Sequence, residues 1–158
     1  MKESILAVID SLEQVPQVLI PLVREIPTAF LKRRPAANKW SVHEHACHIS
    51  VVHGLFLPRL EIMLNEPVPV IVPYDPITSY PDDELLKLDL EESLINIQNN
   101  RSKLVAHLRK LSINDWSKTA SHEEYNNYSV FIMFRHLALH DFFHIYRIEE
   151  LLLQKNWE

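Results

Sequence analysis

Residues 130–154 read VFIMFRHLALHDFFHIYRIEELLLQ, a stretch that combines the pattern of a long helix with a cluster of histidines. Its apolar residues recur at helical spacing and include Met133, Leu137, Ile148 and Leu151. His136, His140 and His144 follow one another at intervals of four, so they lie on one side of the helix. An i, i+4 pair of histidines is the geometric part of a zinc motif, although His140 to His144 lacks the glutamate general base of that motif. The stretch therefore predicts a helix that offers metal ligands, with a further ligand from elsewhere in the chain.

Two more helical regions precede the middle of the chain. Residues 4–25 carry apolar residues at three-to-four spacing, but Pro16 and Pro21 lie among them, so we expect one interrupted helix or two consecutive helices. Ser41 and Glu44 have the spacing of a capping box, in which each side chain satisfies a free backbone N–H of the other residue. A second helix is therefore expected to begin there and to run to about residue 64.

The third helical region is expected over residues 82–111, opened by Asp82 or Asp83, whose charge complements the positive end of the helix dipole. Before it, residues 65–81 contain five prolines and predict a long ordered loop. After it, residues 112–127 form a mostly polar connector, and neither connector shows a convincing alternating strand. Several polar residues of the third region are expected on its outer face, namely Asp89, Glu92, Asn96, Gln98, Asn99 and Arg101.

These elements predict an all-α protein. The last helix is expected to begin after Ser129 as its N-cap and to end near Gln154. A single Gly among 158 residues argues against barrels, sandwiches and glycine-rich phosphate loops. Four apolar stripes on four helices are most simply buried in a four-helix bundle, and the length suits one domain over residues 1–158.

Charge and cysteine content exclude several classes of function. The formal net charge is −5, and the longest basic run is Lys32-Arg33-Arg34, so a nucleic-acid partner is not expected. No stretch reaches the roughly 18 uninterrupted apolar residues of a membrane span. The chain has one cysteine, Cys47, and the first residues are acidic and polar where a signal peptide would be apolar. We therefore expect a cytoplasmic protein that does not bind membranes.

Seven of the nine histidines lie in two predicted helices, at positions 43, 45, 48 and 53 and at positions 136, 140 and 144. Imidazole is the commonest metal ligand in proteins, and three protein ligands with an open position typify a catalytic metal site. On a helical wheel, His140 and His144 fall within or beside the apolar stripe, whereas His136 lies beyond its margin. In the second helix the wheel favours His45 over His48 as the inward-facing residue.

The other candidates have plainer interpretations. We expect His43 to be a solvated residue in the first turn of its helix, and His53 to be a core or interface residue. His107 suits the last turn of the third helix, where a partial positive charge complements the dipole. Cys47 points away from the apolar stripe, which makes a thiolate ligand or nucleophile improbable.

Several short segments occur in a characteristic order and spacing. They are Arg34-Pro35, Lys39-Trp40-Ser41-Val42, Glu44, His48-Ile49, Arg59-Leu60, Tyr80, Asn114-Asp115-Trp116, His122 and the run from His140 to His144. Together they resemble the DinB-like (YfiT/DinB) metalloprotein superfamily, which includes metal-dependent hydrolases and bacillithiol- or mycothiol-dependent transferases. The resemblance covers nearly the whole chain.

The resemblance implies a four-helix bundle, often a homodimer, with one divalent first-row transition metal such as zinc or nickel. It implies His48, His140 and His144 as the ligands, and so favours His48 over His45. Two features depart from many relatives. Arg147 stands where Gln is common, and Asn126-Asn127 stand where a Gly is common. Arg147 would either bind an anionic group of the substrate or form an ion pair with Glu150 one turn on.

The function expected on this basis is a metal-dependent enzyme acting on a small molecule, of thiol S-transferase or hydrolase type. The metal would act as a Lewis acid that lowers the pKa of water or of a low-molecular-weight thiol. No general base is obvious, and His122, Asp141 and Glu44 are candidates to orient a ligand imidazole. Two alternatives stay open: a metal-binding or stress-associated dimeric bundle without turnover, and a histidine cluster that serves only core packing.

Overall fold

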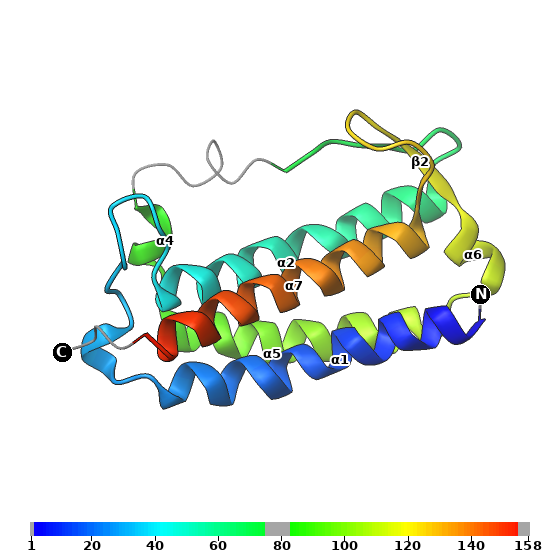
Figure 1. The fold of residues 1–158 in the computed structure, drawn as a ribbon. Helices are drawn as coiled ribbons and strands as arrows, with labels where there is room; N and C mark the ends of the chain where they lie inside the picture. Colours follow the sequence, from blue (N-terminus) through cyan, green and yellow to red (C-terminus); the bar gives the residue numbers. More distant parts are fainter. Residues whose placement is uncertain (1, 75–82, 155–158) are drawn as a thin grey trace.

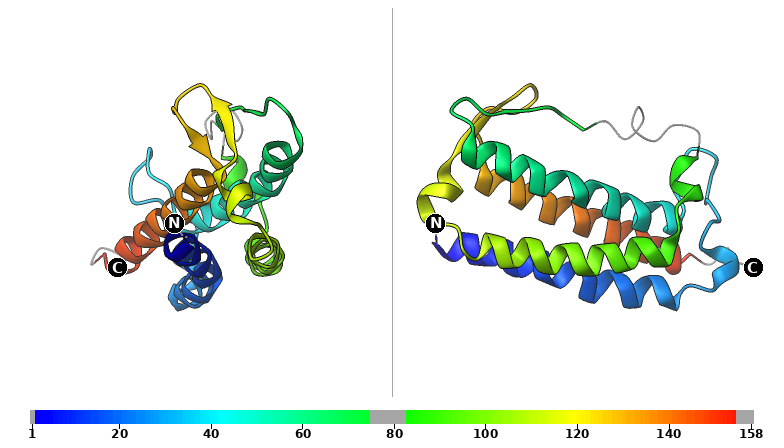
Figure 2. Two further views of the ribbon diagram at one scale, coloured as in Figure 1. Left: turned by 90° about the vertical axis from the view of Figure 1, so that its right-hand side faces the viewer. Right: turned by 180° about the vertical axis from the view of Figure 1, so that it is seen from behind.

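Four long helices run alongside one another in the computed structural model, which describes residues 2–74 and 83–154 (Figure 1). They are α1 (Lys2–Glu25), α2 (Val42–Asn65), α5 (Leu90–Leu108) and α7 (Val130–Leu152). Helix α2 packs against α5 and α7, and α1 packs against the same two helices, so α1 and α2 occupy opposite corners (Figure 2). The predicted all-α four-helix bundle is thus confirmed.

Short elements fill the connections between these helices. The described residues form η1 (Thr28–Phe30), α4 (Glu84–Lys87), α6 (Ile113–Ser117), β1 (Val70–Ile71), β2 (Thr119–His122) and β3 (Tyr128–Ser129). The strands form a small sheet in the order β1-β2-β3, with β1 parallel to β2 and β2 antiparallel to β3. The register places Val70 opposite Ser121, Ile71 opposite His122, Thr119 opposite Ser129 and Ala120 opposite Tyr128. The sequence showed no convincing strand because segments of two to four residues are too short to display an alternating pattern.

The predicted N-caps of α2 and α7 are confirmed. The Ser41 hydroxyl accepts a hydrogen bond from the Glu44 backbone N–H at 3.3 Å, and the Ser41 backbone N–H donates to Glu44 Oε2 at 2.9 Å. The Ser129 hydroxyl accepts from the Ile132 backbone N–H at 3.2 Å. Both helices that carry the histidine clusters therefore start at a fixed residue, which sets the rotation at which their imidazoles face the bundle.

Two predictions of helix boundaries are corrected. Residues 2–25 form one continuous helix through Pro16 and Pro21, because its buried stripe packs against α5 and α7 along the whole length. The single helix expected over residues 82–111 is interrupted. Helix α4 ends at Lys87, Leu88 is extended, and Asp89 starts α5 by accepting a hydrogen bond from the Glu92 backbone N–H at 2.8 Å. Asp82 lies outside the described residues.

The apolar core consists of two clusters, one toward each end of the bundle. One includes Leu12, Val52, Phe56, Leu104, Met133 and Leu137, and the other includes Val15, Ile49, Leu94, Ile97, Ile145 and Ile148. A buried charged residue separates the two clusters on α5 and on α7: Arg101 falls between Ile97 and Leu104, and Asp141 between Leu137 and Ile145. Helices α1 and α2 are long and apolar enough to cross a membrane by length and composition alone, but their apolar faces are used in this core.

Arg101 was expected on the outer face of its helix, and this prediction is wrong. Its side chain is 1% exposed and that of Asp141 is 0% exposed, and the guanidinium Nη2 donates to Asp141 Oδ2 at 2.6 Å. A helical wheel places charged residues outside by default, whereas here the carboxylate on α7 neutralises the guanidinium on α5 within the core. A buried charge is tolerated when it is paired and hydrogen-bonded.

Arg101→Met should destabilise the protein strongly, because it leaves the Asp141 carboxylate buried without its cation. Loss of one partner of a buried ion pair typically costs about 3–5 kcal/mol. The double variant Arg101→Met/Asp141→Leu should recover most of that loss, since it removes both charges. Urea unfolding of the metal-free protein measures all three free energies. A loss below about 1 kcal/mol in the single variant would show that the pair is not essential for stability.

Candidate metal centre

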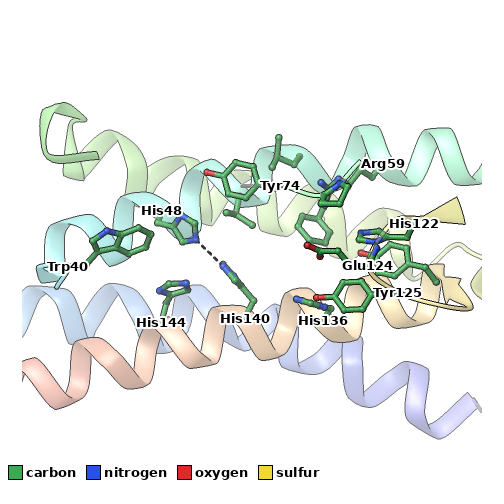
Figure 3. Close-up of a pocket in the computed structure, with 15 residues that line it drawn as sticks. Trp40, His48, Arg59, Tyr74, His122, Glu124, Tyr125, His136, His140 and His144 are labelled. Carbon is green, nitrogen blue, oxygen red and sulfur yellow. Dashed lines mark hydrogen bonds between the residues drawn. The ribbon is translucent and has the colours of Figure 1, made fainter. Parts of the chain in front are cut away.

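Helices α2 and α7 face each other through imidazole rings. One potential ligand nitrogen each from His48, His140 and His144 lie within 4.8 Å of one another. His48 Nε2 is 3.0 Å from His140 Nε2, and the ring centroids of His48 and His144 are 4.6 Å apart (Figure 3). The spacing of four residues on α7 places two rings on one face, and His48 from α2 approaches them from the opposite side. The structure thus brings together the three residues that the resemblance named as ligands.

His45, also on α2, contacts the ring of His144. The Nδ1 atoms of the two rings are 2.8 Å apart, so one of them donates a hydrogen bond to the other. If the Nδ1–H of His144 is the donor, its Nε2 carries the lone pair that is free to bind a cation. The wheel ranked His45 above His48 because it measures only how far a residue faces inward, and both residues are buried. The positions of their neighbours on α7 distinguish them.

Asp141, one of the residues expected to orient a ligand imidazole, contacts His140. Asp141 Oδ1 is 3.1 Å from His140 Nδ1, which leaves Nε2 of this ring directed toward His48. The other carboxylate oxygen binds Arg101. A chain of contacts from Arg101 through Asp141 to His140 therefore fixes the orientation of this imidazole, the arrangement that metal-binding histidines commonly show.

Burial keeps the imidazoles of His45, His48 and His144 neutral near pH 7. Loss of solvation lowers the pKa of His48 and of His144 well below the ordinary value. Repulsion from positive charge on the neighbouring histidines lowers both pKa values further. Loss of solvation, followed by the charge of Arg147, lowers the pKa of His45 to about 4. Neutral imidazole is the form that coordinates a metal.

The donor set fits a first-row divalent cation. Two nitrogens bound to one tetrahedral zinc, at roughly 2.0–2.1 Å each, are about 3.3 Å apart, which is close to the 3.0 Å between His48 and His140. No carboxylate or thiolate belongs to the cluster of described residues. Three imidazoles without a fourth protein ligand leave coordination positions open, as catalytic rather than structural zinc sites do.

The three imidazoles open onto a cavity of about 300 Å³. Figure 3 shows Trp40 beside His48 and His144 at one end of this cavity, and Arg59, His122, Glu124 and Tyr125 at the other end. The Trp40 ring stacks on His144 at a centroid distance of 5.7 Å and lies 4.8 Å from His48. The cavity gives a small molecule access to the open side of the imidazole cluster.

The remaining orienting candidates lie elsewhere. His122, in β2, packs against Tyr125 and Tyr128 at the far end of the cavity. The Glu44 carboxylate accepts hydrogen bonds from Ser41 and from Arg34, so it serves the helix cap and a partly buried ion pair. Of the three candidates, Asp141 is the one whose contact with a ligand imidazole the structure describes.

Other histidines have roles that the sequence described in part. His136 lines the cavity one turn before His140, outside the imidazole cluster, in agreement with its place on the wheel. His53 is buried in the core as expected. His43 is 2% exposed, which contradicts the solvated position expected for it. The wheel missed this burial because α4, which packs on the start of α2, is distant in sequence.

Several cavity residues drew no functional interpretation from the sequence. Trp40, Tyr74 and Tyr125 lie in three different connections, and Arg59 lies in α2, eleven residues after His48. Arg59 had one available signal, a lone cation near the apolar stripe of α2. Arg147 forms an ion pair with Glu150, the second of its two predicted roles.

Known proteins of similar sequence cover most of the chain. A protein of Oceanobacillus iheyensis named "Putative metal-dependent hydrolase" is 27% identical over 149 residues, which make up 94% of this chain and 86% of that protein. A protein of the same name from Bacillus pumilus is 25% identical over 159 residues, 99% of this chain and 89% of that protein. The similarity to these relatives extends over nearly the full length of the chain.

The fold is also shared with a solved structure. YfiT from Bacillus subtilis, described as "a probable metal-dependent hydrolase with an unusual four-helix bundle topology", matches with a TM-score of 0.89 and 24% identity. The match covers 100% of this chain and 91% of that chain, which establishes the common fold. The sequence model of the DinB superfamily matches residues 11–148. By this match, and in agreement with the resemblance noted in its motifs, the chain belongs to the DinB superfamily.

Proposed function

We propose that this protein is a metal-dependent hydrolase of small molecules, with a divalent first-row cation such as zinc or nickel held by His48, His140 and His144. The observation that carries the proposal is the convergence of these three imidazoles on the wall of an open cavity. The names of the relatives support the hydrolase class. A purely structural metal site would need no such opening, so the cavity favours an enzyme over a metal-binding bundle without turnover.

A bound cation would supply Lewis acidity, which activates a water or a thiol at neutral pH and polarises a carbonyl oxygen. The chain's own residues hold the imidazoles in place for that cation. Arg101 and Asp141 hold His140, and His45 holds His144. Of the described residues that line the cavity, Glu124 is the one carboxylate, and it is exposed. Proton transfer is therefore assigned to water or to the cavity histidines.

Thiol S-transfer is the second candidate, and it rests on the family resemblance of the sequence motifs. The same imidazole cluster suits it, because a low-molecular-weight thiol would take the place of water at the cation. The two reactions differ in the nucleophile and share the site, so one experiment compares them. A homodimer in the cytoplasm stays a prediction of the sequence.

Metal content tests the site. Protein reconstituted with zinc or nickel should retain about one cation per chain after gel filtration, by elemental analysis, because three imidazoles suffice for a catalytic site. His48→Ala and His140→Ala should lose it, and His107→Ala, changed in the last turn of α5, should not. Loss of metal in His45→Ala but not in His48→Ala would overturn the assignment of ligands.

Turnover is tested on the same preparations. The metal-loaded protein should hydrolyse p-nitrophenyl esters or anilides, and His140→Ala should not. A parallel assay with cellular thiols and 1-chloro-2,4-dinitrobenzene measures thiol transfer. Activity confined to the thiol assay would replace the hydrolase by the transferase, and inactivity of the metal-loaded protein in both assays would favour the bundle without turnover.

His45 should act on the metal through His144. His45→Phe removes the partner of His144 Nδ1 and should weaken zinc binding about 10–100-fold, as loss of an orienting partner usually does. His45→Gln keeps a hydrogen-bonding group near this position and should keep most of the affinity. Competition with a fluorescent zinc chelator measures both constants. Equal affinities in the Phe variant and the unchanged protein would show that the contact between the two rings does not orient the ligand.

Acid should destabilise the metal-free protein. Burial lowers the pKa of His45 and of His53 from 6.5 to about 4 in the folded protein. Below pH 6.5 the unfolded chain binds protons that the folded protein excludes, so stability is present above that pH and is lost as the pH falls. Each histidine should cost up to about 1.4 kcal/mol per pH unit. Urea unfolding in the presence of a chelator at pH 7.5 and 5.5 measures the difference. His53→Gln should reduce it, and equal stabilities at the two pH values would contradict the expectation.

A further inference from the structure

The cavity has a second polar end, away from the imidazole cluster. We name it the distal end and define it by the residues that line it, Arg59, His122, Glu124, Tyr125, Tyr128 and His136. Figure 3 shows Arg59 of α2, His122 of β2, Tyr125 of the β2–β3 connection, and His136 of α7 around this end. None of these side chains belongs to the metal-ligand cluster of the described residues.

The contacts of Arg59 that the structure describes are to uncharged groups. Its Nη2 donates to the Val72 carbonyl oxygen at 2.7 Å, and its guanidinium lies 5.5 Å from the centre of the Phe56 ring. No ion pair among the described residues includes it. A guanidinium carries five N–H donors, so one backbone carbonyl leaves most of its hydrogen-bonding capacity unused.

Arg59 is also partly removed from water. Burial lowers the pKa of this guanidinium from its ordinary value, the effect expected for a desolvated cation that no carboxylate neutralises. The other partly buried or buried arginines of the bundle differ in this respect, because Arg101 is paired with Asp141, Arg34 with Glu44 and Arg147 with Glu150. Among the described residues no carboxylate pairs with this half-buried cation in the cavity wall, so an anion that enters the cavity would be a suitable partner for it.

Glu124 is the one acidic side chain among the described residues of the distal end, and it forms no ion pair with Arg59. Burial lowers the pKa of His136, the charges of His140, His122 and Arg59 lower it further, and the charge of Glu124 raises it. Glu124 is exposed at the rim, where its backbone N–H donates to His122 Nδ1 at 3.2 Å. The phenol of Tyr128 and the rings of His122 and His136 add hydrogen-bonding groups around the guanidinium.

An apolar section joins the two ends. Its lining includes Val52, Leu55, Phe56 and Pro73. Arg59 follows His48 by eleven residues on the same helix, which corresponds to about 16 Å along its axis. A molecule that reaches from the imidazoles to the guanidinium is thus extended, with an apolar body between two polar ends.

We propose that the distal end binds the carboxylate of the substrate through Arg59, so that the enzyme acts on small organic carboxylates with an apolar body and a hydrolysable group at the other end. The part of this inference that concerns the hydrolysable group of the substrate rests on the proposed function, whereas binding of the carboxylate does not require the metal. A carboxylate accepts two parallel N–H bonds from a guanidinium, a geometry that a neutral amide does not reproduce. Arg59 is a binding residue in this assignment and takes no part in the chemical step.

The test compares two matched probes on metal-free protein. 3-Phenylpropionate and 3-phenylpropionamide have the same shape and differ in charge. Calorimetric titration in the presence of a chelator should show the carboxylate binding at least about tenfold more tightly, since a hydrogen bond to a charged group is worth that much or more. Added salt should weaken binding of the carboxylate and leave binding of the amide unchanged. In NMR spectra, the carboxylate should shift the ring resonances of His136.

Variants then locate the carboxylate. Arg59→Met should abolish the tenfold preference, and Arg59→Lys should retain part of it as a point charge. Arg135→Met is the matched control, because Arg135 also lies over an aromatic ring, that of Phe131 at 5.3 Å, but does not line this cavity. His140→Ala should leave the preference unchanged. Circular dichroism establishes that each variant is folded.

Three results would overturn the proposal: equal affinities for the two probes, a preference that survives Arg59→Met, or a preference lost in His140→Ala. The last would place the carboxylate on the imidazoles. If Arg59→Met does not fold, the salt dependence and the His136 shifts of the unchanged protein decide the question. Failure of metal binding with an intact carboxylate preference would refute the proposed hydrolase and leave the anion site standing.

Discussion

The buried ion pair between Arg101 and Asp141 is the contact on which the rest of the structure depends. It joins α5 to α7 in the layer between the two apolar clusters, where neither charge is exposed to water. Each charge is tolerable there only because of the other, so the pair fixes how the two helices align along the bundle. Asp141 also contacts His140, which makes the same pair part of the support of the candidate metal centre.

The imidazole cluster places a second constraint on the same layer. The buried rings of His45, His48 and His144 and the half-buried ring of His140 lie close together, and proton binding by one of the buried rings would introduce a charge beside the others. Burial keeps His45, His48 and His144 neutral, and repulsion from neighbouring histidines adds to this effect at His48 and His144. These neutral rings are in the form that binds a cation, because a metal would not have to displace protons from their lone pairs.

The cavity joins the candidate metal centre to a second, chemically different end, so a bound molecule would have a preferred orientation. Imidazoles lie at one end, a guanidinium that pairs with no described carboxylate lies at the other, and apolar side chains lie between them. The β2–β3 connection contributes to the end that holds Arg59, so a segment that looks like a polar connector in the sequence shapes the site. Differences in such connections offer a physical route by which proteins of this fold would bind different substrates.

The sequence by itself determined the four helices, two of their caps and the i, i+4 pair on α7, because each depends on residues close together in the chain. It also named His48, but through resemblance to a family, since the wheel favoured His45. Only the tertiary structure decided which histidine of α2 faces which ring of α7, that Arg101 is buried, that α4 is separate from α5, and that Arg59 shares a cavity with the histidines. These features depend on partners 40 to 100 residues away, or on short turns, and periodicity within one helix carries no information about the charge or shape that another helix presents to it.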